Sequence, residues 1–298
     1  MTAPAERYDA AAVNCGRRFG QRCGAAYDLL GRLEPGLCID VGAAIGRTTW
    51  RMLDASPGST VTAYEPFTGN HRYFNDLLGD DPRATLRPVA VADRAGAASF
   101  VAPGVVGPGE TGWAKDLQGY SPHGRLADAG RGLRLPVQTV TLDDEIDRQV
   151  RFLKIDVQGG ELAVLRGAER LMRGPGVDIV YLEFNGALRV LEFLKAHGYV
   201  IFDCAYMAWP TRRYWRNWAR RRPDRLVPAW RIVDEGVMSM GSPVAHGWPP
   251  SRPGAFAAYC AWFFTHRLLF SGLQTDLLCV REDVLPAVWR AQAQAAAA

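Results

Sequence analysis

The sequence predicts a doubly wound α/β fold with a mainly parallel sheet. Short apolar runs rich in β-branched residues, such as residues 37–41 and 152–157, have the length of buried strands. Segments with apolar residues at helical spacing separate most of these runs, and glycine or proline ends many of them. Alternation of buried strands with amphipathic helices is typical of a parallel sheet covered by helices on both faces.

The individual elements follow from the same patterns. We expect strands at residues 37–41, 59–64, 86–91, 135–140, 152–157, 177–183, 199–203 and 275–280. We expect helices at residues 46–55, 69–78, 161–172 and 188–197, and helix-compatible sequence at 10–33. Residues 95–134 are rich in glycine and proline, which favours a hairpin and a long loop.

The first strand leads into a glycine turn. Gly42 and Gly46 follow it, and glycine lets the backbone come close to a ligand without a Cβ in the way. Roughly 20 residues later the second strand ends at Glu65, and a carboxylate there can accept hydrogen bonds from both hydroxyls of a ribose. The spacing predicts a ligand that contains adenosine, although a tight strand-to-helix connection with no ligand stays an alternative.

The details of this turn favour S-adenosylmethionine. The spacing Asp40-x-Gly42-x-x-x-Gly46 lacks the middle glycine that admits a pyrophosphate in the dinucleotide motif. An acidic residue at position 40 suits an amino group better than a phosphate, because it would repel an anion at short range. A nicotinamide oxidoreductase is therefore disfavoured.

Composition sets the broad class. The chain has 298 residues, 48% of them hydrophobic and 22% charged, as in ordinary globular proteins. No apolar run has the roughly 20 residues of a membrane span, and the first residues lack the apolar core of a secretory signal. The six cysteines contain no C-x-x-C pair, which disfavours metal binding by thiolates. We expect a cytoplasmic protein.

A basic segment lies at residues 206–231. It holds eight arginines and one acid, a local charge of +7, interleaved with tryptophans. Arginine and tryptophan together can bind phosphate, stack on aromatic rings or lie at a membrane interface. We interpret the segment as a lid or docking surface for an acceptor that carries phosphate. A solvated arginine face and binding to a membrane or a nucleic acid are the alternatives, and no base-reading motif supports nucleic acid.

Several of these stretches together resemble one family. The matching stretches are I-D-V-G-A-A-I-G at 39–46, Y-E-P at 64–66, T-L-D-D at 141–144, F-L-K-I-D-V-Q-G-G-E at 152–161, V-L-R-G-A at 164–168 and T-D-L-L at 275–278. The combination, which covers about residues 37–203 and 272–282, resembles the FkbM family of S-adenosylmethionine-dependent methyltransferases. The block around Asp156 is its most specific part.

The resemblance implies a class I methyltransferase fold, a Rossmann-like sheet of seven mostly parallel strands whose last strand is antiparallel. It also implies methylation of hydroxyl groups, commonly on sugars, glycolipids or polyketide-type metabolites. One position departs from the family, because Gln158 stands where the family usually has glutamate. We do not expect a metal, but Asp156 and Glu183 leave magnesium as an alternative.

Residues are assigned to roles by their place at the ends of strands. Asp156 and Glu183 end two neighbouring strands and are our candidates for the catalytic base or an acceptor-orienting carboxylate; a helix cap and a salt-bridged strand end are the structural alternatives. Glu161 begins the next helix, where the helix dipole also favours a carboxylate. The candidate cofactor-binding residues are Asp40 at the amino group of the methionine part, Glu65 at the ribose, and Gly42, Ala43, Gly46, Pro66, Phe67, Ala92 and Asp156. The candidate acceptor-binding residues are Gln158, Asn185, Trp113, Tyr120, His123, Arg212 and Arg213.

These assignments divide the chain into five segments. We expect an N-terminal helical extension (1–36), the cofactor-binding core (37–203), the basic insertion (204–271), a final strand that completes the core (272–290) and an alanine-rich tail (291–298).

The predicted function is O-methylation of a small hydroxylated acceptor, with S-adenosylmethionine as methyl donor and S-adenosylhomocysteine as product. A protein that binds the cofactor without turnover is the rival interpretation. We expect no nucleic acid partner; contact with a membrane surface and a homodimer stay open.

Overall fold

The computed structural model describes residues 26–27, 29–102, 124–127, 132–184, 187–203 and 275–284. These form a seven-stranded sheet with the order β10-β11-β9-β8-β1-β2-β3. All neighbours pair in parallel except β11, which is antiparallel to both β9 and β10. The expected mostly parallel sheet with an antiparallel last strand is confirmed.

The strands of this sheet, with the exception of β3, lie within two residues of the predicted ones. They are β1 (Leu37–Val41), β2 (Thr60–Tyr64), β3 (Ala84–Arg87), β8 (Val150–Ile155), β9 (Val177–Phe184), β10 (Tyr199–Asp203) and β11 (Thr275–Arg281). Every residue of β1 and β9 is buried, as expected for central strands covered on both faces.

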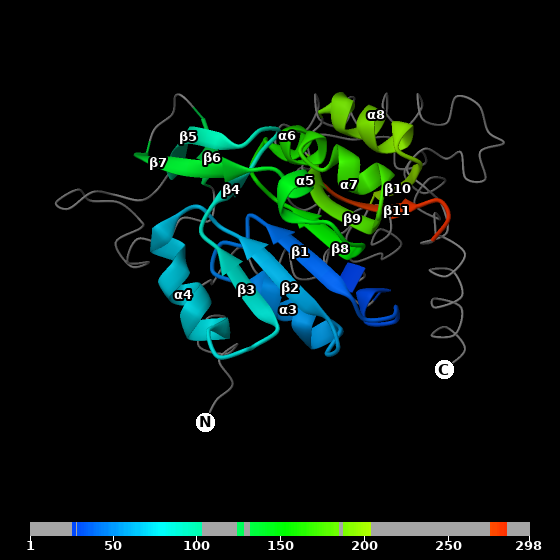
Figure 1. The fold of residues 1–298 in the computed structure, drawn as a ribbon, viewed down its shortest axis with the longest axis horizontal. Coiled ribbons are helices and arrows are strands. Elements are labelled where there is room, and N and C mark those ends of the chain that lie inside the picture. The colour runs from blue at the N-terminus through cyan, green and yellow to red at the C-terminus, as the bar shows by residue number, and fades with distance from the viewer. Residues whose placement is uncertain are drawn as a thin grey trace, which may run out of the picture.

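Helices cover both faces of the sheet (Figure 1). On one face, α3 (Arg47–Ala55) and α4 (Thr68–Leu78) pack with the helical residues near Leu29. On the other, α5 (Leu142–Glu145), α6 (Glu161–Arg166), α7 (Glu169–Arg173) and α8 (Leu188–Ala196) form a second apolar core. The doubly wound architecture is therefore confirmed.

A second sheet was only partly predicted. It has the order β4-β7-β5-β6, from β4 (Ala90–Val91), β5 (Gly96–Ala102), β6 (Arg125–Leu126) and β7 (Leu133–Val140). The prediction of one strand over residues 86–91 is wrong. Strand β3 ends at Arg87, and β4 pairs with β7 in the second sheet instead of continuing in the main sheet. Pro88 has no backbone N–H, so it cannot extend the ladder of β3.

Two helix predictions also need correction. The helix expected over 161–172 is divided into α6 and α7 at Gly167, whose added Cβ would lie 2.0 Å from the carbonyl oxygen of Ala92. The carboxylate of Asp143 caps α7 by accepting the backbone N–H groups of Arg170 and Leu171 at 2.8 and 2.7 Å. On α8, Leu188 is exposed rather than packed on the core.

No helix within the described ranges combines the length and the apolar character that a bilayer crossing requires. The basic segment at 206–231 and the tail at 291–298 lie outside the described residues.

Candidate active site

The turn after β1 lies directly against the end of β8. Gly42 has a φ of +78°, and a Cβ there would lie 1.9 Å from the carbonyl oxygen of Asp156. Both the left-handed backbone and the close approach require glycine at this position. This contact fixes the two strand ends relative to each other.

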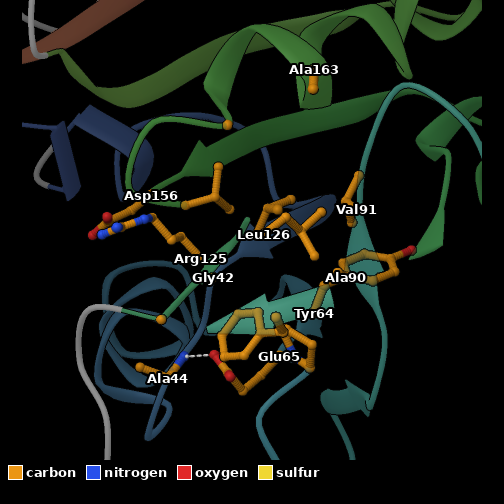
Figure 2. Close-up of a pocket in the computed structure, with 16 residues that line it drawn as sticks. Gly42, Ala44, Tyr64, Glu65, Ala90, Val91, Arg125, Leu126, Asp156 and Ala163 are labelled. Atoms are coloured by element: carbon orange, nitrogen blue, oxygen red, sulfur yellow. Dashed lines mark hydrogen bonds between the residues drawn. The ribbon is translucent and has the colours of Figure 1, made fainter. Parts of the chain in front are cut away.

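Glu65 lies beside this turn at the end of β2. Its carboxylate accepts the N–H of Ala44 at 2.8 Å and that of Phe67 at 2.8 Å, the first drawn as a dashed line in Figure 2. Burial raises the pKa of Glu65 to about 7. The side chain of Asn70 also hydrogen-bonds to this carboxylate, but a carboxylate has about four lone-pair sites, so Glu65 can still accept a hydrogen bond from a ligand.

A cavity opens at this edge of the main sheet, between the glycine turn and the second sheet (Figure 2). Its enclosed volume is about 210 Å³, and the space counted out through its open mouth is about 830 Å³. Its lining residues are Val41, Gly42, Ala44, Tyr64, Glu65, Pro66, Ala90, Val91, Phe100, Gly124, Arg125, Leu126, Asp156, Val157, Gly160 and Ala163.

The cavity has two chemically different ends. Figure 2 shows Tyr64, Ala90 and Val91 together on one side, while Gly42 and Asp156 lie on the other, with Glu65 and Ala44 between them along the lower wall. The apolar end can pack against a flat ring, and the opposite end carries the carboxylate of Asp156.

Asp40 does not line this cavity. Its side chain is fully buried and accepts the hydroxyls of Thr48 and of Thr49, the latter at 2.7 Å. Its other oxygen lies 3.1 Å from the ammonium of Lys154. The predicted position at the amino group of a ligand therefore needs correction, because protein partners surround this carboxylate below the turn.

Lys154 is the main residue that sequence reasoning missed. It is 4% exposed, and its ammonium donates to the carbonyl oxygen of Gly42 at 2.9 Å. The same ammonium lies 3.1 Å from Asp40 and 3.9 Å from Asp156. Lys154 thus links β1, the glycine turn and β8, and a lysine within an apolar strand was the available signal for it.

Asp156 and Glu183 lie close together, as expected from adjacent strands. Gln158 joins them, since its side-chain amide donates to Asp156 at 2.9 Å and to Glu183 at 2.8 Å. Gln158 has a φ of +56°, a left-handed backbone that a residue other than glycine seldom adopts. Of the two carboxylates, only Asp156 lines the cavity.

Other acidic groups affect this pair. Burial and then the neighbouring Asp156 and Asp276 raise the pKa of Glu183 to about 8. Burial also raises the pKa of Glu161, which accepts the backbone N–H of Gly159 at 2.9 Å. Glu161 therefore has a structural role in the first turn of α6, where it holds the backbone of Gly159.

The remaining predicted cofactor residues divide into two groups. Pro66 lines the cavity, as do Gly42, Glu65 and Asp156. The others lie behind the lining: Ala43 is in an apolar core, Gly46 packs against Phe74, Phe67 stacks behind Phe100 at 6.3 Å between ring centroids, and the carbonyl of Ala92 faces Gly167.

Six predicted acceptor-binding residues lie outside the described residues: Trp113, Tyr120, His123, Asn185, Arg212 and Arg213. Phe100, Arg125 and Leu126 of the second sheet were missed. They come from a glycine-rich stretch whose pairing with distant strands has no short-range sequence pattern. Among the described residues, no group of three or more histidines, cysteines or acids is arranged to hold a metal ion.

Comparison with solved structures gives matches of low identity. An FkbM methyltransferase from Methylobacillus flagellatus KT is 18% identical, with a TM-score of 0.40 over 59% of this chain and 44% of that chain, so the match spans under half of that protein. A precorrin-6y C5,15-methyltransferase from Geobacter metallireducens GS-15 is 17% identical over 60% of this chain and 71% of that one, with a TM-score of 0.35. The plantazolicin methyltransferase BpumL, solved with S-adenosylhomocysteine, is 10% identical over 93% and 89%, with a TM-score of 0.34.

A search of curated protein sequences found no match. The family model of the methyltransferase FkbM domain matches residues 40–201, more than half of the chain and nearly all of the described core. This match includes the glycine turn, Glu65 and the Asp156–Gln158–Glu183 group. The chain belongs to the FkbM methyltransferase domain family.

Proposed function

We propose that this protein is an S-adenosylmethionine-dependent O-methyltransferase whose acceptor is a hydroxyl of a sugar, a glycoside or glycolipid, or a polyketide-like metabolite. The observation that carries the proposal is the position of Glu65, which lies at the end of β2, beside the Gly42 turn and within the cavity. Family membership supports methyl transfer, and the hydroxyl acceptor is the expectation that this family resemblance gives.

The cavity fits the parts of S-adenosylmethionine in sequence. Tyr64, Val91 and Phe100 provide apolar walls for the adenine. Glu65 lies at the position of the ribose, and its carboxylate can accept a hydrogen bond from a ribose hydroxyl beside those from Ala44, Phe67 and Asn70. The methionine part then extends toward Gly42 and Asp156, where a carboxylate favours its ammonium.

Bound S-adenosylmethionine supplies a methyl group activated by a positively charged sulfur. The protein must hold the acceptor oxygen in line with that methyl carbon and keep water away. It must also receive the proton that the acceptor hydroxyl loses. Because Asp156 is assigned to the ammonium, Glu183 is the candidate for this proton: its pKa, raised to about 8, suits a base, and Gln158 connects it to Asp156.

Direct titration tests the cofactor. S-adenosylmethionine, S-adenosylhomocysteine and NAD are titrated calorimetrically into the wild type, Glu65→Ala and a control, Glu169→Gln, which removes a partly exposed carboxylate on α7. We expect micromolar binding of both adenosyl compounds, loss of it in Glu65→Ala only, and weak binding of NAD. Failure of the wild type to bind either adenosyl compound would overturn the proposal.

Turnover is tested separately. The wild type is incubated with S-adenosylmethionine and a panel of sugars, glycolipids, nucleotide-activated sugars and polyketides, and formation of S-adenosylhomocysteine is followed with the mass of the product. A methylated hydroxyl supports the proposal. Binding of cofactor with no turnover on the panel, or transfer to nitrogen or carbon, would contradict the O-methyltransferase assignment.

A further inference from the structure

The second sheet places one charged residue over the cavity. In β6, Arg125 pairs with Val101 and Leu126 pairs with Phe100 of β5. Gly124 precedes them so close to Phe100 that an added Cβ would lie 2.1 Å from its ring. These contacts hold the short strand against β5, and Gly124, Arg125 and Leu126 all line the cavity.

Among the residues that the structure describes, Arg125 is the only basic one in the cavity lining, which also contains the carboxylates of Glu65 and Asp156. Its side chain is exposed and forms no hydrogen bond or ion pair with any residue that the structure describes. Other arginines are engaged: Arg83 with Asp81, and Arg151 with Asp178. No described residue therefore occupies the guanidinium donors of Arg125, which can serve a ligand.

The direction of the side chain identifies the end of the cavity that Arg125 serves. Figure 2 shows the guanidinium on the side of the cavity where Asp156 and Gly42 lie, away from Ala90 and Val91 at the apolar end. If the adenine of a ligand lies at the apolar end and its ribose at Glu65, the remaining third part of the ligand lies next to this guanidinium.

That third part, in S-adenosylmethionine, is an amino acid with one ammonium and one carboxylate. Asp156 complements the ammonium, and a planar guanidinium is suited to bind a carboxylate through two parallel hydrogen bonds. We propose that Arg125 binds the carboxylate of the methionine part and so makes β6 a component of the cofactor site. This inference rests on the proposed function, because it assumes an adenosyl amino acid in the cavity.

A comparison of two ligands tests this assignment. S-adenosylhomocysteine and its decarboxylated analogue, which keeps the ammonium, are titrated into the wild type, Arg125→Gln and Arg125→Lys. The control is Arg134→Gln, which removes the same charge from an exposed position on β7 of the same sheet, outside the cavity lining.

The wild type should bind S-adenosylhomocysteine about 10- to 100-fold more tightly than the decarboxylated analogue, the range for hydrogen bonds between charged groups. In Arg125→Gln the two ligands should bind about equally, and Arg125→Lys should give an intermediate ratio, because lysine keeps the charge without the planar fork. Arg134→Gln should keep the ratio of the wild type.

Two results would overturn the inference while leaving the proposed function intact. One is an unchanged preference for the carboxylate in Arg125→Gln, which would assign Arg125 to the acceptor or to neutralisation of Asp156. The other is an equal loss of affinity for both ligands, which would mean that Arg125 only covers the adenosine. If the wild type binds neither ligand, the proposed function itself fails and the inference fails with it.

Discussion

Replacement of Lys154 by methionine is predicted to lower the free energy of unfolding of the protein. Methionine has a similar length and no charge, so the change removes the ammonium and leaves the packing nearly intact. Asp40, which is fully buried, would then keep only the hydroxyls of Thr48 and Thr49 as partners. The carbonyl oxygen of Gly42 would also lose its donor.

The expected magnitude follows from the burial of both partners. Lys154 is 4% exposed and Asp40 is 0% exposed, and removal of one member of such a buried pair destabilises a protein by about 3–5 kcal/mol. For a domain of this size, that corresponds to a melting temperature lower by roughly 6 to 20 °C. Urea unfolding, followed by circular dichroism, measures the free energy directly.

Two further variants make this prediction sharp. Lys195→Met removes an exposed lysine on α8 and should change the stability little. The double variant Asp40→Asn with Lys154→Met removes both charges and should be more stable than Lys154→Met alone, since no uncompensated charge stays buried. The reasoning is refuted if Lys154→Met is no less stable than Lys195→Met, or if the effects of the two substitutions simply add.

Three other predictions concern the cavity. Gly42→Ala should unfold at a clearly lower temperature and lose S-adenosylhomocysteine binding, because its Cβ would lie 1.9 Å from the carbonyl oxygen of Asp156. The control is Gly159→Ala, whose Cβ has no atom within 4 Å, so it should show only backbone strain and keep the binding. Thermal unfolding and calorimetric titration measure both variants. Burial raises the pKa of Glu65 from 4.5 to about 7, so the stability that its protonated form contributes should be lost as the pH rises through this range, while affinity for the ribose should increase as the carboxylate ionises. Both trends should be absent from Glu65→Gln in titrations across the same pH range, and persistence of either would assign it to another group. Gln158→Glu places a third carboxylate between the two strand-end acids and should shift the rising limb of the pH–rate profile to higher pH; an unchanged profile would show that the amide does not control their ionisation.

Local patterns in the sequence were enough to predict the main sheet and its cofactor-side turns. Strand length, glycine at position 42 and a carboxylate at the end of the second strand are short-range features, and β1, β2 and Glu65 lie where these features indicate. The adjacency of Asp156 and Glu183 was also predictable, because parallel strands end at the same edge of a sheet.

The tertiary structure decided which way side chains point and which distant segments meet. Asp40 and Glu65 are both strand-end acids, yet one is enclosed by Lys154 and two threonines while the other faces the cavity. No local sequence pattern indicates that Arg125 lines the cavity, and it does so only because β6 pairs with β5. The sequence by itself determined the sheet, the turn and the carboxylate at the end of β2, because periodicity and backbone conformation act within a few residues. The closure of the cavity by the second sheet and the buried lysine pair were decided only by packing between segments that lie far apart in the chain, which no local pattern records.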